Sequence, residues 1–367
     1  MHRAQNSYLQ SKRWLDTLNQ NNIVPGLERI RKLMNLLGNP HEELKLIVVG
    51  GTNAKGSTCL NLNYNLAKSG LVTGCYTSPH IHSIRERIRI NSNIISEDEF
   101  STQINLIRKI EQDENIEASY FEIITAAAYN YFRENNVDYA IMEVGLGGEW
   151  DAVNIGNARI AILTTLGLDH IDYLGSDLDK IAETKAKIVR NESHVITGWP
   201  EKYLSFIPKC KSLTNHMDIG EWIQCTMNIL NIKRKCELIQ LPGRCEKSGN
   251  FIIDNAHNPQ AIKFLISKDR NFECIIIGMM KDKDIENIVN ELPKESEILI
   301  CNLSTERSAS NKEIAKVCEK LDYKFRIFSN VESAMRHAKN RRTLVTGSFY
   351  TVSEAREFLE LEGHSEL

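Results

Sequence analysis

The chain has 367 residues, of which 42% are hydrophobic and 25% charged, and its formal net charge is −3. This length allows two globular domains. The small net charge gives no electrostatic basis for binding nucleic acid or a membrane surface, and no apolar stretch is long enough to cross a bilayer. The nine cysteines contain no C-x-x-C pair, and the N-terminus lacks the apolar core of a secretion signal. We therefore expect a cytoplasmic protein with reduced thiols.

The first part of the chain alternates between helical and strand patterns. Residues 8–38 are predicted to be helical, and this segment ends at Gly38-Asn39-Pro40. Further helices are predicted at 57–69, from the Ser96–Glu99 capping box to about 112, at 120–134 and at 178–190. Strands are predicted at 44–49, 72–77, 139–144 and 160–165. This alternation predicts a mostly parallel sheet with helices on both faces.

The segment from about 198 to 240 has weak periodicity, and its basic run Lys233-Arg234-Lys235 is typical of a solvated face. After Pro242-Gly243-Arg244 a second series begins, in which five predicted strands are each followed by a helix: 251–254, 273–278, 297–301, 324–328 and 343–346. The sequence therefore predicts an α/β protein with two doubly wound domains, residues 1–241 and a smaller C-terminal domain at 242–367.

A glycine-rich turn follows the apolar run in L-K-L-I-V-V-G-G-T-N-A-K-G-S, residues 44–57, and leads into a predicted helix. Backbone N–H groups at such a helix start, together with the ammonium of Lys55, suit a nucleotide phosphate. The spacing departs from the usual P-loop, because Ala54 precedes Lys55 and Gly56 separates it from Ser57. The alternative is an ordinary strand-to-helix turn with a surface lysine.

Three polar residues follow predicted strands of the first domain. Ser78 follows the strand at 72–77, Glu143 lies near the end of the strand at 139–144, and His170 closes Gly167-Leu168-Asp169-His170. Ligands of open parallel sheets bind beyond the carboxyl ends of the strands, so these side chains could hold Mg²⁺ beside phosphate oxygens. Each has a simpler alternative, namely a helix cap, a buried acid and a hydrogen-bonded loop residue.

The chain resembles folylpolyglutamate synthase and dihydrofolate synthase, members of the Mur-ligase superfamily. The resemblance covers most of the length and rests on ordered motifs: P-G-L-E-R-I (25–30), L-G-N-P (37–40), G-T-N-A-K-G-S (51–57), Y-T-S-P-H (76–80), E-R-I-R-I-N (86–91), F-E (121–122), E-V-G-L-G-G (143–148), G-L-D-H (167–170), P-G-R (242–244), D-N-A-H-N-P (254–259), G-M-M-K-D-K-D (278–284) and G-S-F-Y (347–350).

The resemblance implies a role for each of a larger set of residues. ATP would be held by Asn53, Lys55, Gly56, Ser57, Thr58, Arg244 and Asp254. Mg²⁺ would be bound by Ser78, Glu143, His170 and Lys185, with two metal sites and with Lys185 carbamylated. The substrates would contact Phe121, Glu122, Asp151, His257 and Ser348, and Lys55, Lys185 and His257 would be catalytic.

The activity implied by this resemblance is ATP-dependent amide formation. A folate or dihydropteroate carboxylate would attack the γ-phosphate to give an acyl phosphate, and the amine of L-glutamate would then displace phosphate. Positioning and charge neutralisation would supply most of the catalysis. The ATP-binding domain would be residues 1–241 and the glutamate-ligase domain 242–367, in a chain that we expect to be monomeric.

Four departures from the family pattern concern the phosphate loop and substrate choice. Ala54 replaces a glycine, which costs of order 1 kcal/mol if that position needs a positive φ. Glu149-Trp150 stands where the family has Arg-Leu, Lys187 replaces a small residue, and residues 191–240 are shorter than the family's segment. Two alternatives follow: an amino-acid ligase acting on a non-folate carboxylate, or a catalytically silent nucleotide-binding paralogue.

Overall fold

The structure, a computed structural model, describes residues 2–18, 25–361 and 363. The chain forms two compact units. Unit 1 contains the described residues up to Leu166 and Asp177–Leu238, and unit 2 contains Gly167–Ser176 and the described residues from Ile239 onward. The predicted boundary at 241/242 lies three residues from the observed one, but the prediction placed 167–176 in the first domain. Residues 167–176 belong to unit 2 because they contact residues far along the chain. Local sequence patterns do not show such contacts.

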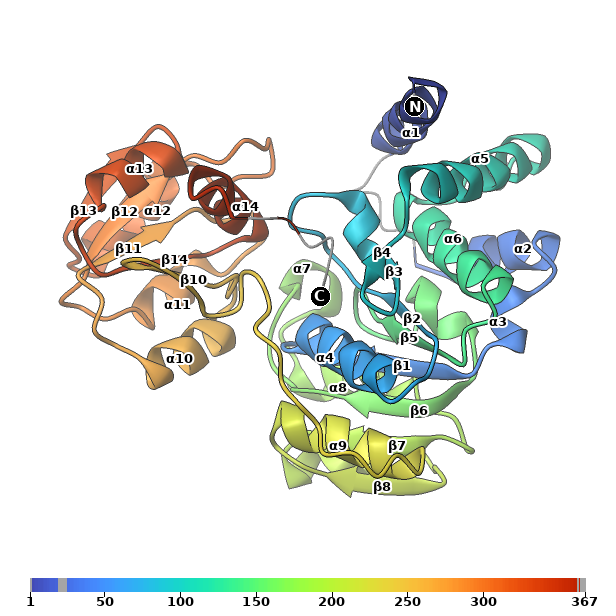
Figure 1. Cartoon of the computed structure of the whole chain (residues 1–367). Helices are drawn as coiled ribbons and strands as arrows, with labels where there is room; N and C mark the ends of the chain where they lie inside the picture. The colour runs from blue at the N-terminus through green and yellow to red at the C-terminus, as the bar shows by residue number, and fades with distance from the viewer. Residues whose placement is uncertain (1, 19–24, 362, 364–367) are drawn as a thin grey trace. The chain divides into compact units, whose positions relative to one another are not determined.

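Unit 1 is built on an eight-stranded sheet with the order β4-β3-β2-β5-β1-β6-β7-β8 (Figure 1). Only β3 and β4 are antiparallel to their neighbours. The strands are β1 (Leu46–Gly50), β2 (Thr73–Tyr76), β3 (Ile88–Ile90), β4 (Asn93–Ile94), β5 (Tyr139–Glu143), β6 (Ala158–Leu163), β7 (His194–Thr197) and β8 (Ser212–Asn215). The predicted mostly parallel sheet is confirmed.

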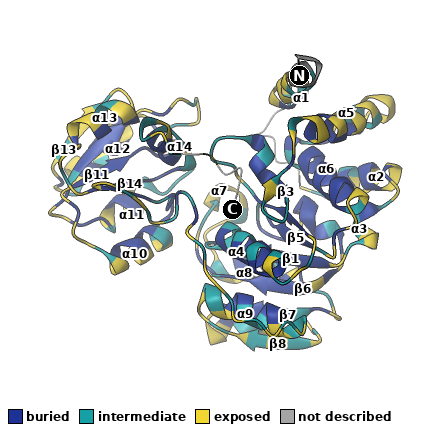
Figure 2. Ribbon diagram, in the orientation of Figure 1, coloured by how far each residue is buried: buried dark blue, intermediate teal, exposed yellow. Residues whose placement is uncertain are grey.

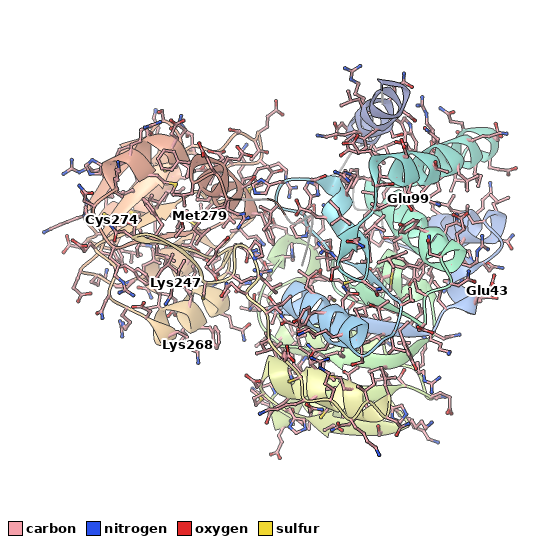
Figure 3. The ribbon with its side chains drawn as sticks, in the orientation of Figure 1. Glu43, Glu99, Lys247, Lys268, Cys274 and Met279 are labelled. Atoms are coloured by element: carbon pink, nitrogen blue, oxygen red, sulfur yellow. The ribbon has the colours of Figure 1, made fainter. Side chains whose placement is uncertain are left out.

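The helices of unit 1 cover both faces of this sheet. They are α1 (His2–Thr17), α2 (Glu28–Leu36), α3 (Pro40–Glu43), α4 (Lys55–Lys68), α5 (Glu97–Glu114), α6 (Tyr120–Glu134), α8 (Leu178–Ala186) and α9 (Ile219–Ile229), with short 3₁₀ turns η1 (Ile84–Arg87), η2 (Ala152–Ile155) and η3 (Glu201–Phe206). The predicted capping box of α5 is present, since Ser96 accepts from the Glu99 N–H and Glu99 accepts from the Ser96 N–H. Figure 3 labels Glu99 on this helix.

Side chains of β2 alternate between the two cores of unit 1. Cys75 belongs to the apolar cluster that contains Leu62 of α4 and Ile223 of α9. On the opposite face, a Cβ added at Gly74 would lie 2.6 Å from the ring of Phe132 in α6. Successive strand residues point to opposite faces, so this alternation places α4 and α9 on one side and α6 on the other.

The helical stretch predicted over residues 8–38 is present as two separate helices. α1 ends at Thr17, residues 25–27 are not helical, and α2 begins at Glu28, while residues 19–24 lie outside the described residues. Gly26 has a φ of 127°, which a helix cannot contain. Pro25 before it lacks a backbone N–H, so this dipeptide interrupts the helical stretch.

Unit 2 contains a six-stranded sheet with the order β13-β12-β11-β14-β10-β9, in which only β9 is antiparallel. Its strands are β9 (Glu246–Ser248), β10 (Phe251–Ile253), β11 (Cys274–Ile277), β12 (Glu297–Cys301), β13 (Phe325–Phe328) and β14 (Thr343–Thr346). Its helices are α7 (Ile171–Leu174), α10 (Pro259–Lys268), α11 (Ile285–Asn290), α12 (Asn311–Lys320), α13 (Val331–His337) and α14 (Phe349–Phe358). The five predicted strand–helix repeats are confirmed, and so is the predicted fold class.

Each unit has its own buried core around its sheet (Figure 2). In unit 2 the cluster includes Ile262 of α10, Ile288 of α11, Ile314 of α12 and the central strand residue Ile300. Within the described part of the chain, none of the helices has the length and apolar content needed to span a membrane.

Candidate active site

The glycine-rich turn connects β1 to α4, which begins at Lys55. Gly51 has a φ of 133°, and a Cβ at this position would lie 2.0 Å from Thr164 Oγ1. The hydroxyl of Thr164 donates to the Asn53 carbonyl at 2.7 Å, and the Asn53 N–H donates to Thr165 Oγ1 at 2.9 Å. The end of β6 thus holds the turn, and the first N–H groups of α4, which lack intrahelical acceptors, form an anion-binding helix start.

Two lysine ammonium groups meet at this turn. Lys55 Nζ lies 3.1 Å from the carbonyl oxygens of Gly51 and Thr52, and Lys185 Nζ lies 3.0 Å from that of Gly51. Lys185 is 5% exposed and comes from the end of α8. Both ammonium groups therefore donate to the Gly51 carbonyl oxygen, beside the start of α4. This arrangement concentrates positive charge where a phosphate would bind.

Glu143 and Ser78 lie on the strands next to this turn. Glu143 ends β5 and pairs in register with Val49 of β1, and it is 3% exposed. The Ser78 N–H donates to Glu143 Oε2 at 2.8 Å, just beyond the end of β2. A hydroxyl and a carboxylate are hard oxygen ligands, so the chemistry of this pair fits Mg²⁺.

His170 does not lie in the same unit as Ser78 and Glu143. It precedes α7 in unit 2, with a φ of 51°, whereas Ser78 and Glu143 belong to unit 1. Among the described residues, no group of three or more His, Cys, Asp or Glu side chains could hold a metal ion. The predicted metal set, which combines a serine, a glutamate, a histidine and a lysine, stays a prediction.

A buried ionic cluster surrounds Asp169 in unit 2. Lys283 Nζ lies 2.7 Å from Asp169 Oδ1, and Asn258 Nδ2 donates to Oδ2 at 3.1 Å. His257 Nε2 is 3.6 Å from Oδ2. Burial by itself raises the pKa of Asp169, but the interactions with His257, His170 and Lys283 outweigh it and hold the pKa well below its ordinary value. Asp169 is therefore ionised.

The predicted substrate histidine, His257, is oriented by its surroundings. Its Nδ1 donates to the Asn255 carbonyl at 2.8 Å, so this nitrogen carries a proton and cannot act as a base. The imidazole lies 5.9 Å from the ring of Phe349, and the guanidinium of Arg244 lies 5.7 Å from the same ring. The structure thus brings Arg244 and His257 to the ring of the same residue, Phe349.

The structure gives Ser348 and Asp254 structural partners in unit 2. Ser348 caps α14 by accepting from the Thr351 N–H, and it is 2% exposed. Asp254 accepts from the N–H groups of Cys245 and Ala256, so its carboxylate organises the turn that carries Arg244.

The predicted acceptor-binding residues surround the start of α6 in unit 1. Glu122 completes the capping box of α6 and lies 3.1 Å from Arg29 Nε, and its Oε1 is buried with no partner among the described residues. The Phe121 ring packs against Tyr76 at 6.0 Å. Asp151 accepts from the N–H groups of Gly145, Leu146 and Val153, and burial raises its pKa to about 6.

Sequence reasoning assigned no role to several residues that shape the site: Thr164, Thr165, Asp169, Asn258 and Lys283. Asp169, Asn258 and Lys283 lie in three of the family motifs, G-L-D-H, D-N-A-H-N-P and G-M-M-K-D-K-D. Membership of these motifs was the only sign in the sequence that they belong to the site. Their roles come from pairing across 89 to 114 residues of chain, and no local pattern reports such pairing.

Comparison with known proteins gives the family. Residues 49–203 match the Mur ligase middle domain, and residues 243–349 match the Mur ligase glutamate ligase domain. A dihydrofolate synthase/folylpolyglutamate synthase from Buchnera aphidicola subsp. Baizongia pistaciae is 31% identical, over 94% of this chain and 94% of that protein. The chain belongs to the dihydrofolate synthase/folylpolyglutamate synthase family. The resemblance stated from the sequence motifs is confirmed.

Solved structures of dihydrofolate synthase/folylpolyglutamate synthase family members have the same fold. Escherichia coli FolC in complex with DHPP and ADP aligns with a TM-score of 0.87 at 27% identity, over 96% of this chain and 97% of that one. A bifunctional folylpolyglutamate synthase/dihydrofolate synthase with Mn, AMPPNP and L-glutamate bound aligns with a TM-score of 0.84 at 28% identity, over 96% of this chain and 98% of that one.

Some relatives are much longer. The chain spans 50% of a probable bifunctional folylpolyglutamate synthase/dihydropteroate synthase from Haloferax volcanii, which is 27% identical over 95% of this chain.

Proposed function

We propose that this protein is an ATP-dependent ligase that joins L-glutamate to a folate or dihydropteroate carboxylate. The observation that carries the proposal is the turn at the start of α4, where Lys55 and Lys185 both donate to the Gly51 carbonyl beside Glu143 and Ser78. This turn offers cationic and backbone donors for phosphates next to oxygen ligands for a divalent metal. Related structures with ADP and DHPP, and with Mn, AMPPNP and L-glutamate, support the same set of ligands.

The proposed reaction needs no covalent nucleophile on the protein. The acceptor carboxylate attacks the γ-phosphorus of ATP, so ADP leaves and an acyl phosphate forms, and the glutamate amine then displaces phosphate. Asn53, Gly56, Ser57 and Thr58 at the turn and helix start bind the phosphates, and Lys55 neutralises their charge. Unit 1 accordingly binds ATP and the pterin-bearing acceptor, the latter through Phe121, Glu122 and Asp151.

We assign the incoming glutamate to His257 and Ser348 of unit 2, and nucleotide contacts to Arg244 and Asp254. Since Nδ1 of His257 already donates to Asn255, this histidine acts as a polar contact and not as a general base through Nδ1. The short distances that join Arg244, Phe349 and His257 support a shared binding surface in unit 2.

Ser78, Glu143 and His170 would hold Mg²⁺, which when bound would withdraw charge from the transferred phosphate. We further propose that Lys185 is carbamylated and supports a second Mg²⁺. Two ammonium groups on one carbonyl oxygen repel each other, and converting the Lys185 amine to a carbamate replaces that repulsion with attraction to Lys55. Mass analysis of the intact protein under non-acidic conditions should show the added carboxylate, and Lys185→Arg should lack it.

The experiment that tests the function is ADP release with Mg-ATP and L-glutamate, offering dihydropteroate and tetrahydrofolate separately, with mass detection of product. One added glutamyl unit is expected on at least one acceptor. Lys55→Ala should lower kcat about 100-fold or more, because it removes a cation that faces the phosphates. Lys68→Ala, on the same helix and paired with Glu237 instead, is the matched control and should keep wild-type kcat.

Other outcomes would identify a different member of the superfamily. ADP release with another carboxylate, but with neither pterin acceptor, would indicate a ligase of different specificity, which the exposed Trp150 and its neighbour Glu149 would then explain. Nucleotide binding without any product would indicate a silent paralogue. Size-exclusion chromatography with light scattering tests the proposed monomer.

A further inference from the structure

Residues 167–176 connect two parts of unit 1 but are held by unit 2. The chain leaves unit 1 after Leu166 and returns to it at Asp177. Gly167 packs so closely on Gln260 of α10 that an added Cβ would lie 2.1 Å from Gln260 Oε1. This segment, which we call the 167–176 loop, therefore has its tertiary partners in the unit formed by residues 239 onward.

Asp169 joins the 167–176 loop to unit 2 through several polar contacts. Its side chain is 10% exposed, and its ion-pair partner Lys283 is 8% exposed, so the 2.7 Å contact is shielded from solvent. Asn258, itself 2% exposed, donates to Asp169 through Nδ2 while its Oδ1 accepts from the Ala261 N–H and caps α10. Lys283 and Asn258 together hold the carboxylate at the start of α10.

The same carboxylate contacts the next residue in the chain. The His170 N–H donates to Asp169 Oδ1 at 2.9 Å, and His170 Nε2 lies 4.0 Å from Asp169 Oδ2. His170 has a φ of 51°, a left-handed conformation that is unfavourable for a residue with a Cβ. Contacts to its neighbours must therefore maintain this conformation.

We propose that Asp169 is a positioning residue for His170, and that Lys283 and Asn258 hold Asp169 in place. The inference rests on the proposed function, in which His170 is a metal ligand. Asp169 fixes the backbone of His170 through the N–H bond to Oδ1, and its Oδ2 attracts the imidazole across 4.0 Å, so loss of the carboxylate would free both. Loss of a partner that orients a ligating histidine costs about 10–100-fold in metal affinity. The metal affinity of the protein would thus depend on an ion pair that lies within unit 2.

The main alternative is that the Asp169 ion pair only stabilises unit 2. Removing one member of a buried pair destabilises a protein whatever its function, so thermal stability does not separate the two roles. Metal binding and the local opening of the 167–176 loop do separate them.

The experiment compares Asp169→Asn and Lys283→Met with two matched controls. Asp172→Asn changes an exposed acid in the same loop, and Lys281→Met changes an exposed lysine that donates to the Glu306 carbonyl outside the cluster. His170→Ala measures the contribution of the proposed ligand itself. Mn²⁺ affinity is measured with AMPPNP by the electron paramagnetic resonance signal of free Mn²⁺, and hydrogen exchange is followed by mass spectrometry.

We expect Asp169→Asn and Lys283→Met to weaken Mn²⁺ binding about 10-fold or more and to speed amide exchange of the 167–176 loop. Strands β1 and β5 of unit 1 should keep wild-type exchange. The double variant should lose little more Mn²⁺ affinity than either single variant, because both changes break one interaction. Both controls should bind Mn²⁺ as the wild type does.

Two results would overturn the inference. Unchanged loop exchange in both cluster variants would show that the ion pair does not hold the loop. Faster loop exchange with unchanged Mn²⁺ affinity, in a protein where His170→Ala does weaken Mn²⁺ binding, would show that Asp169 does not position His170. Unchanged Mn²⁺ affinity in His170→Ala would instead contradict the proposed metal ligand, and exchange alone would then decide whether the ion pair holds the loop.

Discussion

Ala54 is the residue at which the backbone of the glycine-rich turn is strained. Its φ of 68° lies in the left-handed region, where a Cβ is unfavourable. We expect Ala54→Gly to raise the free energy of unfolding of unit 1 by about 0.5–1 kcal/mol, since relief of the strain exceeds the entropy that glycine adds to the unfolded chain. Urea denaturation checks the change. Ala67→Gly, in the same helix, should instead lower the free energy of unfolding by a similar amount. A change of the same sign in both variants would contradict the prediction.

His80 makes the stability of unit 1 sensitive to pH. Burial, with a smaller contribution from Arg87, lowers the pKa of His80 to about 4, and Arg87 Nε donates to His80 Nδ1 at 3.0 Å, which requires a neutral ring. The unfolded chain takes up this proton near pH 6.5 and the folded chain only near pH 4. The free energy of unfolding should therefore fall by about 2.5 kcal/mol as pH drops from 6.5 to 4.

Denaturation of the wild type and of His80→Gln across this range checks the contribution of His80. Glutamine keeps an acceptor for Arg87 but does not titrate, so the difference between the two proteins should shrink as pH falls. His337→Gln, at an exposed histidine of α13, should follow the wild type. A constant difference between wild type and His80→Gln would show that His80 is not the responsible group.

At the level of elements, the packing of α6 on β2 depends on the absence of a side chain at Gly74. A Cβ there would lie 2.6 Å from two atoms of the Phe132 ring. Gly74→Ala should therefore cost about 1–3 kcal/mol in the free energy of unfolding. Phe132→Leu alone should also lower the free energy of unfolding. The loss in the double variant should be smaller than the sum of the losses in the two single variants. Urea denaturation of the wild type and the three variants measures this coupling. Additive costs would contradict the contact.

Elements with strong local signals were predictable from the sequence, and five short strands were not. The capping boxes at Ser96 and Ser310 and the five strand–helix repeats of unit 2 are local patterns, and the structure contains them. β3, β4, β7, β8 and β9 were missed. β3, β4 and β9 have two or three residues, and the alternate residues of edge strand β8 are exposed, so no apolar run marked them.

For the whole molecule, the two cores predict two separate unfolding events. All four tryptophans, Trp14, Trp150, Trp199 and Trp222, lie in unit 1, so fluorescence reports only that unit, while far-ultraviolet circular dichroism reports both. Ile300→Ala removes a fully buried side chain of unit 2 and should cost about 2–5 kcal/mol. It should shift part of the dichroism transition and leave the fluorescence midpoint unchanged.

The matched variant is Ile162→Ala, at a fully buried position of unit 1, which should move the fluorescence midpoint. If Ile300→Ala shifts both signals equally, the units unfold as one cooperative system and the prediction of two events is wrong.

The sequence by itself determined the fold class, the glycine-rich turn that carries Lys55 and the polar residues that follow the strands, because helix caps, apolar periodicity and glycine-rich turns act over a few residues. Only the tertiary structure decided that Lys185 shares the Gly51 carbonyl with Lys55, that Asp169 pairs with Lys283, and that residues 167–176 belong to unit 2. These contacts join residues 89 to 134 positions apart in the chain. The sheet order and the burial of charge select the partners, and no local pattern encodes either.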